Sequence, residues 1–69
     1  MKTADIGKWV GDELDDLKDA YGLSRDEAIS RLVEGLEADE YRDAMNESQV
    51  KVAVAVALKL GASKKAGRR

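Results

Sequence analysis

Four aspartates in the N-terminal half are spaced so that a helix would place their carboxylates on one side. Asp12, Asp15, Asp16 and Asp19 lie at positions i, i+3, i+4 and i+7, which are neighbours on a helix surface. Carboxylates bind Ca²⁺ and Mg²⁺, but a calcium site uses a loop with a glycine pivot, and these ligands would all come from one straight helix. We therefore interpret the stripe as a solvated face, and we predict no metal and no cofactor.

Catalytic chemistry has few candidate groups in this chain. Histidine and cysteine are both absent, which removes the commonest general base and the most reactive nucleophile. The serines are isolated or placed where they would cap helices, and the carboxylates lie on charged faces. The sequence therefore predicts a protein that is not an enzyme.

Phosphate binding is a stronger possibility, because one stretch has the chemistry of a helix start. Ser24 and Arg25 begin an apolar run, and the first amides of a helix, with the positive end of its dipole, attract anions. Such a pair could hold a DNA phosphate, although an ordinary capped helix explains the same residues. The C-terminal bases would add salt-sensitive, non-specific affinity for nucleic acid, namely Lys64, Lys65, Arg68 and Arg69.

The small net charge of −2 conceals a strong segregation of charge. Residues 1–48 contain 14 acidic and 6 basic residues, a net charge of −8, whereas residues 49–69 contain 6 basic residues and no acidic one. The two parts must therefore face different partners, or each other.

The elements around the candidate phosphate site are two helices joined by a short turn. Gly22 can take the left-handed conformation that ends a helix, and Ser24 with Glu27 forms a capping box that begins the next one. Apolar periodicity predicts helices over about 8–21 and about 25–37. With 69 residues the chain would bury only about 60% of its unfolded surface, so we expect an obligate homodimer. Its predicted core comprises Val10, Leu14, Leu17, Ile29, Leu32 and Val33.

The remaining segments are less clearly patterned. Residues 1–6 show a weak alternation typical of a short strand. Residues 50–60 carry valine or leucine at every even position, as a strand would, but alanines make the other face apolar too. A cap at Asn46 or Ser48 and a glycine at Gly61 favour a helix there. Residues 61–69 are small, polar and basic, and we expect them to be disordered.

These patterns together resemble the ribbon-helix-helix proteins, the Arc, MetJ and CopG type of repressors and antitoxins. The resemblance covers about residues 1–37. It is carried by Ile6 and Gly7 at the end of a short strand, by the apolar positions of the first helix, and by the run from Gly22 to Ile29. The implied fold is mostly α: a short N-terminal strand, two helices and an additional C-terminal helix, in an intertwined homodimer.

The resemblance implies that paired strands lie in the major groove of double-stranded DNA. Met1, Thr3 and Asp5 would face the bases, and Ser24 and Arg25 would contact phosphate. The predicted domains are a dimerisation and DNA-binding core over 1–37, a helical extension over 38–60 and a disordered basic tail over 61–69.

The leading functional hypothesis is a dimeric DNA-binding transcriptional regulator, or the antitoxin of a toxin–antitoxin pair whose residues 38–60 bind the toxin or another protein. The alternative is an acidic helical protein-interaction module that does not bind DNA. No apolar run reaches the roughly 18 residues of a membrane span, and the N-terminus does not resemble a signal peptide. We therefore predict a cytoplasmic protein without membrane association.

Overall fold

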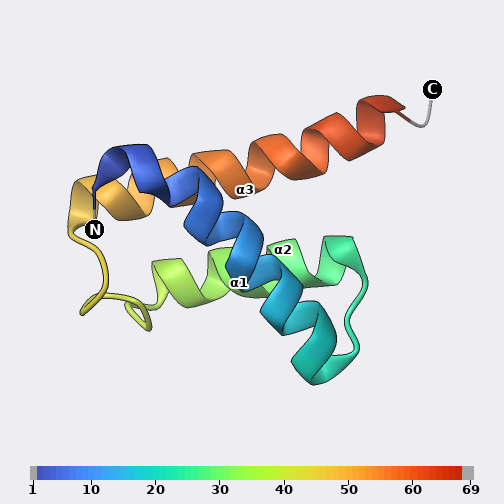
Figure 1. Cartoon of the computed structure of the whole chain (residues 1–69), viewed down its shortest axis with the longest axis horizontal. Helices are drawn as coiled ribbons and strands as arrows, with labels where there is room; N and C mark the ends of the chain where they lie inside the picture. Colours follow the sequence, from blue (N-terminus) through green and yellow to red (C-terminus); the bar gives the residue numbers. More distant parts are fainter. Residues whose placement is uncertain (1, 68–69) are drawn as a thin grey trace.

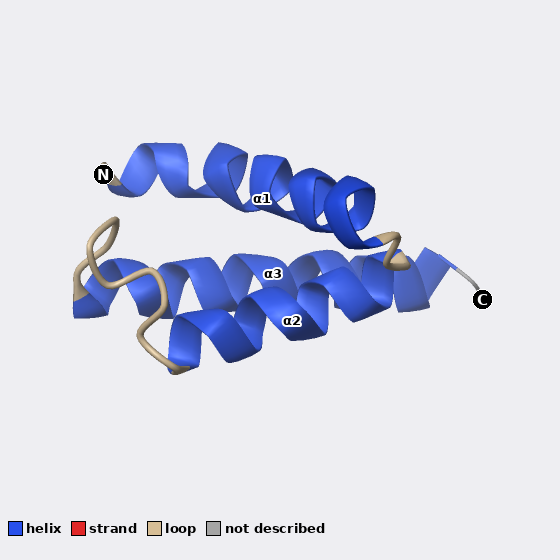
Figure 2. Ribbon diagram, turned by 90° about the horizontal axis from the view of Figure 1, so that it is seen from below, coloured by secondary structure: helices blue, strands red, loops and turns tan. Residues whose placement is uncertain are grey.

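A computed structural model describes the backbone of residues 2–67 and the side chains of residues 2–61. A short 3₁₀ turn, η1 (Thr3–Asp5), leads into helix α1 (Ile6–Tyr21). Helix α2 (Arg25–Glu37) and helix α3 (Glu47–Gly67) follow. Figure 1 shows that α2 and α3 run side by side in opposite directions, while α1 crosses over them. Seen from below, α1 forms one layer and the other two helices form a second (Figure 2).

Helix α1 forms because its apolar residues return to one side every three or four positions. Ile6, Val10, Leu14 and Leu17 are all buried, and this stripe is what an amphipathic helix needs to pack on a core. The helix ends at Gly22, whose backbone has φ of 63° and ψ of 32°. Glycine adopts this left-handed conformation without a steric cost, as the sequence predicted.

Helix α2 begins with the predicted capping box. The Glu27 N–H donates to Ser24 Oγ at 3.2 Å, and the Ser24 N–H donates to Glu27 Oε1 at 2.9 Å. The helix ends in a Schellman motif, in which the Glu40 N–H donates to the Gly35 carbonyl at 3.0 Å. Asp39 takes the left-handed position of that motif, with φ of 65°.

Helix α3 begins with a second capping box and contains the segment whose sequence fitted both helix and strand. The Gln49 N–H donates to Asn46 Oδ1 at 2.9 Å, and the Asn46 N–H donates to Gln49 Oε1 at 3.0 Å. The helical prediction for residues 50–60 is therefore confirmed. Ala53 and Ala57 are fully buried, so two small side chains one turn apart bring α3 close to the other helices.

The predicted N-terminal strand is wrong for the described part of the chain, and so is the ribbon-helix-helix-like fold class that included it. The Asp5 N–H donates to the Lys2 carbonyl at 3.0 Å, which closes a turn. Ile6 is 0% exposed and begins the same apolar stripe as Val10, four residues on. Within the described residues 2–6, the weak alternation therefore belongs to a turn and a helix start.

The second helix has the predicted boundaries, whereas the first begins at Ile6, two residues earlier than predicted. Residues 38–46 form turns rather than part of a helical extension. Helix α3 continues to Gly67, so helical backbone extends through residues 61–67, most of the segment predicted as a disordered tail. Among the described residues, no helix is long and apolar enough to cross a membrane.

Candidate functional site

The residues predicted to read DNA bases lie in the turn before α1. Thr3 and Asp5 are exposed, and they belong to η1 rather than to a strand. Met1 lies outside the described residues. Without an extended backbone at this place, no row of side chains faces outward at the two-residue period that a groove-binding ribbon needs.

One amide of the predicted phosphate site at the start of α2 already donates to a carboxylate of the same chain. Glu27 Oε1 accepts the Ser24 N–H at 2.9 Å, which is the kind of contact a phosphate oxygen would make. The hydrogen bond that the Glu27 carboxylate accepts from the Ser24 backbone N–H, and to a smaller extent its hydrogen bond with the Ser24 side chain, lower the pKa of Glu27. Asp26 lies in the same first turn. Arg25 is exposed, but two acidic residues follow it, so the local charge opposes an anion.

The structure does not bring the predicted nucleic-acid residues together within one chain. Thr3 and Asp5 precede α1, whereas Ser24 and Arg25 follow it, and this helix of 16 residues is about 24 Å long. The side chains of Lys64, Lys65, Arg68 and Arg69 lie outside the described residues.

The predicted dimer core is buried inside a single chain. Val10, Leu14, Leu17, Ile29 and Leu32 are buried, and Val33 is partly buried against them. Ala53 and Ala57 of α3 pack against these residues. Helix α3 therefore buries the apolar side chains that a second copy of the chain was expected to bury. The predicted homodimer stays a prediction, but these six residues no longer require it.

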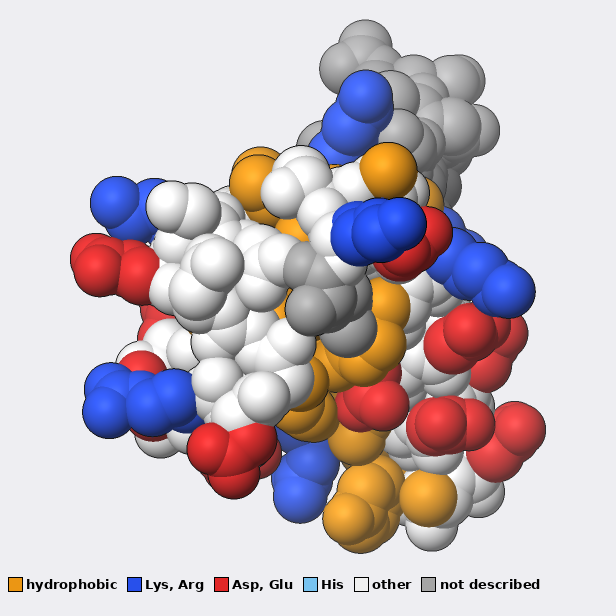
Figure 3. All heavy atoms as spheres, turned by 60° about the vertical axis from the view of Figure 1, so that its left-hand side comes forward, with side chains coloured by type: hydrophobic (Ala, Val, Ile, Leu, Met, Phe, Trp, Pro, Cys, Tyr) orange, Lys and Arg blue, Asp and Glu red, His pale blue; other side chains and the backbone are white. Residues whose placement is uncertain are grey.

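The acidic stripe lies on α1, on the side away from the core. Asp12, Asp15, Asp16 and Asp19 are all exposed. Within the described part of the chain, no group of three or more acidic side chains is arranged to hold a metal ion. Figure 3 shows acidic and basic side chains on either side of a hydrophobic seam.

The turns between α2 and α3 are held to α1 by Tyr41. Its ring contacts Trp9 edge-on, with 5.2 Å between the ring centroids, and its hydroxyl donates to Glu13 Oε2 at 3.3 Å. Burial raises the pKa of Tyr41, and the negative charge of Glu13 raises it further. The ring also lies over Gly35, where an added Cβ would come within 2.9 Å of Tyr41 Cε2.

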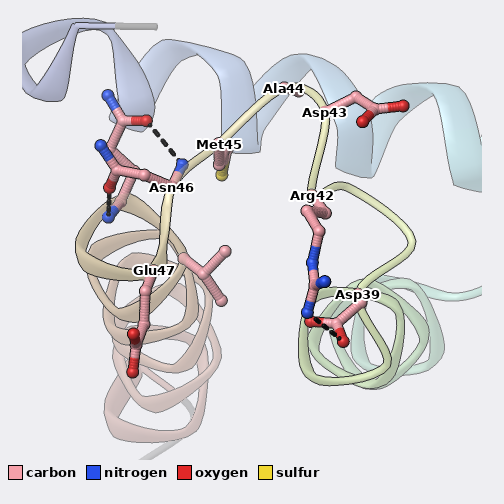
Figure 4. Close-up of a pocket in the computed structure, with 9 residues that line it drawn as sticks. Asp39, Arg42, Asp43, Ala44, Met45, Asn46 and Glu47 are labelled. Atoms are coloured by element: carbon pink, nitrogen blue, oxygen red, sulfur yellow. Dashed lines mark hydrogen bonds and ion pairs between the residues drawn. The ribbon is translucent and has the colours of Figure 1, made fainter.

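An open hollow of about 700 Å³ lies beside these turns. Figure 4 shows Arg42 paired with Asp39, at 2.7 Å, on one side of it. On the other side is Asn46, which exchanges the capping hydrogen bonds of α3 with Gln49, another residue that lines the hollow. Because these four polar side chains already have partners in the chain, we assign no ligand to the hollow.

Among the described residues, two large apolar side chains are exposed: Tyr21 on α1, at 59%, and Leu58 on α3. The Tyr21 ring is stacked against Arg31, whose guanidinium lies 4.5 Å from the ring centroid, whereas no such contact within the described part of the chain covers Leu58. The sequence analysis did not single out Leu58. Leu58 is 55% exposed, and Lys51, Ala55 and Lys59 are exposed around it. We call these four residues the α3 outer face. Val52 and Val54 flank it and are only partly buried. The sequence places these four residues on one side of a helix, because Leu58 lies seven residues after Lys51 and Ala55 lies midway between the two lysines.

Comparison with protein-family models, with curated proteins and with solved structures gave no match for this chain. The resemblance to ribbon-helix-helix proteins is therefore untested by relatives and stays a prediction.

Proposed function

We propose that this chain is a helical protein-interaction module, not an enzyme, that binds another protein through the α3 outer face. The observation that carries the proposal is the exposure of Leu58, at 55%, on a helix whose other large apolar side chains are partly buried. A helix that is apolar on nearly all sides is normally covered on all sides. Here the core covers Ala53 and Ala57 fully and the valines and Leu60 of α3 in part, but it leaves Leu58 exposed.

The proposal keeps one element of the leading sequence hypothesis, in which residues 38–60 bind a toxin or another protein. Within that range the α3 outer face offers a large apolar side chain, a small one and two cations. Interaction surfaces combine an apolar centre with a polar rim, and this face has that layout.

Site-specific crosslinking in living cells tests the proposal. A photoreactive amino acid placed at position 58 should form an adduct with one discrete protein. The same group at Ser30, which is exposed on α2, serves as the matched control and should form none. The purified partner should bind Leu58→Gln about tenfold more weakly than the parent chain. Adducts of equal yield at both positions, or none at position 58, would refute the proposal.

A DNA-binding regulator is the second candidate. It is favoured by the charge of residues 49–69, which contain six basic residues and no acidic one. A salt-titrated assay with duplex DNA separates the two. For the interaction module we expect only non-specific affinity at physiological salt, with Kd of about 10⁻⁴–10⁻⁶ M. Much tighter binding that Arg25→Ala weakens would support the regulator instead.

A further inference from the structure

The α3 outer face has a definite charge pattern. Lys51 and Lys59 are eight residues apart, which is about 12 Å along a helix, and Ala55 lies midway between them. Leu58 lies on the same side of the helix, seven residues after Lys51. The face is therefore a shallow apolar strip with a cation at each end.

The two cations differ in their surroundings on α3. Glu47, in the first turn, lies four residues before Lys51, a spacing at which two opposite charges on a helix attract each other. Lys59 has no acidic residue near it on the helix, because residues 49–69 contain no acid. A partner would therefore supply the opposite charge chiefly at Lys59, and complementary charge selects a partner more than it adds affinity.

A second copy of this chain fits the face poorly. If two α3 helices paired in antiparallel fashion about Ala55, Lys51 of one copy would face Lys59 of the other. In parallel pairing each lysine would face itself, and like charges at such positions destabilise a helix pair. The acidic stripe of α1 would match the charge, but it consists of four aspartates and offers nothing apolar to Leu58.

A nucleic acid or a lipid surface also leaves part of the face unused. Phosphates would engage Lys51 and Lys59 but give Leu58 no apolar partner. A helix that lies in a membrane surface needs a wide apolar side, whereas the fold directs Ala53, Ala57 and much of the valine surface of α3 into its own core.

We propose that the occupant of the α3 outer face is an acidic amphipathic helix of another protein. Its apolar side chains would pack on Ala55 and Leu58, where the small Ala55 allows a close approach, and its carboxylates would lie next to Lys51 and Lys59. This inference rests on the proposed function and adds the chemical class of the partner.

Two labelled peptide probes test the inference by fluorescence anisotropy with the full chain. Both are helical and about three heptads long, with leucine at the a and d positions. One carries glutamate at the flanking positions and the other carries lysine there. The glutamate probe should bind at least about tenfold more tightly than the lysine probe, and the difference should shrink as salt is added.

Variants of the chain then locate the binding surface. Leu58→Gln should weaken binding of the glutamate probe about tenfold. The double variant Lys51→Glu with Lys59→Glu should reverse the preference between the two probes. Lys8→Glu, an exposed change on α1, is the matched control and should leave the preference unchanged. Circular dichroism melts confirm that each variant is folded.

Equal binding of the two probes would overturn the inference, as would a preference that the double lysine variant leaves unchanged. So would binding to anionic lipid vesicles or to duplex DNA that is tighter than binding to the glutamate probe. Failure here differs from failure of the proposed function. A crosslink from position 58 to a basic or non-helical segment would refute the acidic helix and leave the interaction module standing.

Discussion

Gly22 and Gly11 differ in backbone conformation, and alanine at the two positions should have opposite effects. Gly22 has φ of 63°, so alanine there should destabilise the protein by about 1 kcal/mol. Gly11 lies inside α1 with nothing within 4 Å of an added Cβ. Alanine there should stabilise the protein by about 0.5–1 kcal/mol. Urea unfolding of both variants measures the difference, and shifts of the same sign would contradict this account.

Glu27 makes the stability of the α2 capping box depend on pH. Its pKa is lowered from 4.5, mainly by the hydrogen bond from the Ser24 backbone. The folded state therefore binds its proton less readily than the unfolded state does. The stabilisation is complete above pH 4.5 and is lost as pH falls through the lower pKa of the folded state.

Glu27→Gln provides the matched variant, because glutamine also completes a capping box but does not titrate. Melting temperatures of the parent chain and the variant, followed into acid, should show the parent losing stability relative to the variant below about pH 4.5. A constant difference between the two curves would show that the carboxylate of Glu27 does not cap the helix in solution.

At the residue scale the sequence predicted the local contacts and missed a distant one. The capping box and the Gly22 turn depend on residues within a few positions of each other, so spacing alone determines them. The surroundings of Gly35, near the end of the second helix, do not follow from local spacing. Gly35 is buried because Tyr41 folds back over it, and the position of the Tyr41 ring depends on its contact with Trp9 of α1.

The packing of Tyr41 on Gly35 yields a prediction about how the turns between α2 and α3 are held. Gly35→Ala gains about 1 kcal/mol of helix propensity, but its Cβ would meet Tyr41 Cε2 at 2.9 Å. Overpacking of this kind costs about 1–3 kcal/mol, so the variant should be less stable. Gly7→Ala is the control, because nothing lies within 4 Å of a Cβ added at Gly7 on α1. This variant should not be destabilised. Thermal melts compare the two, and a stabilised Gly35→Ala would mean that the ring moves aside freely.

At the scale of elements the periodicity predicted the helices better than it predicted the N-terminus. The second helix was predicted at about 25–37 and is observed at Arg25–Glu37. The first residues were read as a strand because six residues cannot distinguish alternation from the first turn of a helix. The burial of Ile6 against the core, which decides the matter, is a tertiary contact that the local sequence does not contain.

The whole molecule depends on α3, and truncation after Glu47 should unfold it. The truncation removes Ala53 and Ala57 from the core together with four partly buried valines and Leu60. Large apolar side chains contribute about 1.5–3 kcal/mol each when fully buried, and domains are stable by only about 5–15 kcal/mol. A chain ending at Ala62 is the control and should keep the melting temperature of the full chain. A cooperative melt of residues 1–47 would show that the core forms without α3.

At the scale of the whole molecule, the sequence predicted that one chain lacked a sufficient core. That prediction counted the six apolar positions of the first two helices and left open whether residues 50–60 packed on them. With α3 included, the radius of gyration is 11.7 Å, close to the roughly 11 Å expected for a folded chain of this length. The spacing of the four residues of the α3 outer face places them on one side of a helix, but the exposure of that side could not be predicted. Which side of an almost wholly apolar helix stays exposed depends on how the helix docks.

The two connections between helices differ in length, and the difference should set the order in which the chain folds. Residues 22–24 join α1 to α2, whereas residues 38–46 join α2 to α3, and a longer loop costs more entropy to close. The first two helices should therefore pair before α3 docks. Substitutions at the α1–α2 turn, such as Ser24→Ala, should mainly slow folding, and substitutions of Ala53 or Ala57 should mainly speed unfolding. Stopped-flow kinetics would show α3 as the last helix to dock and the first to leave.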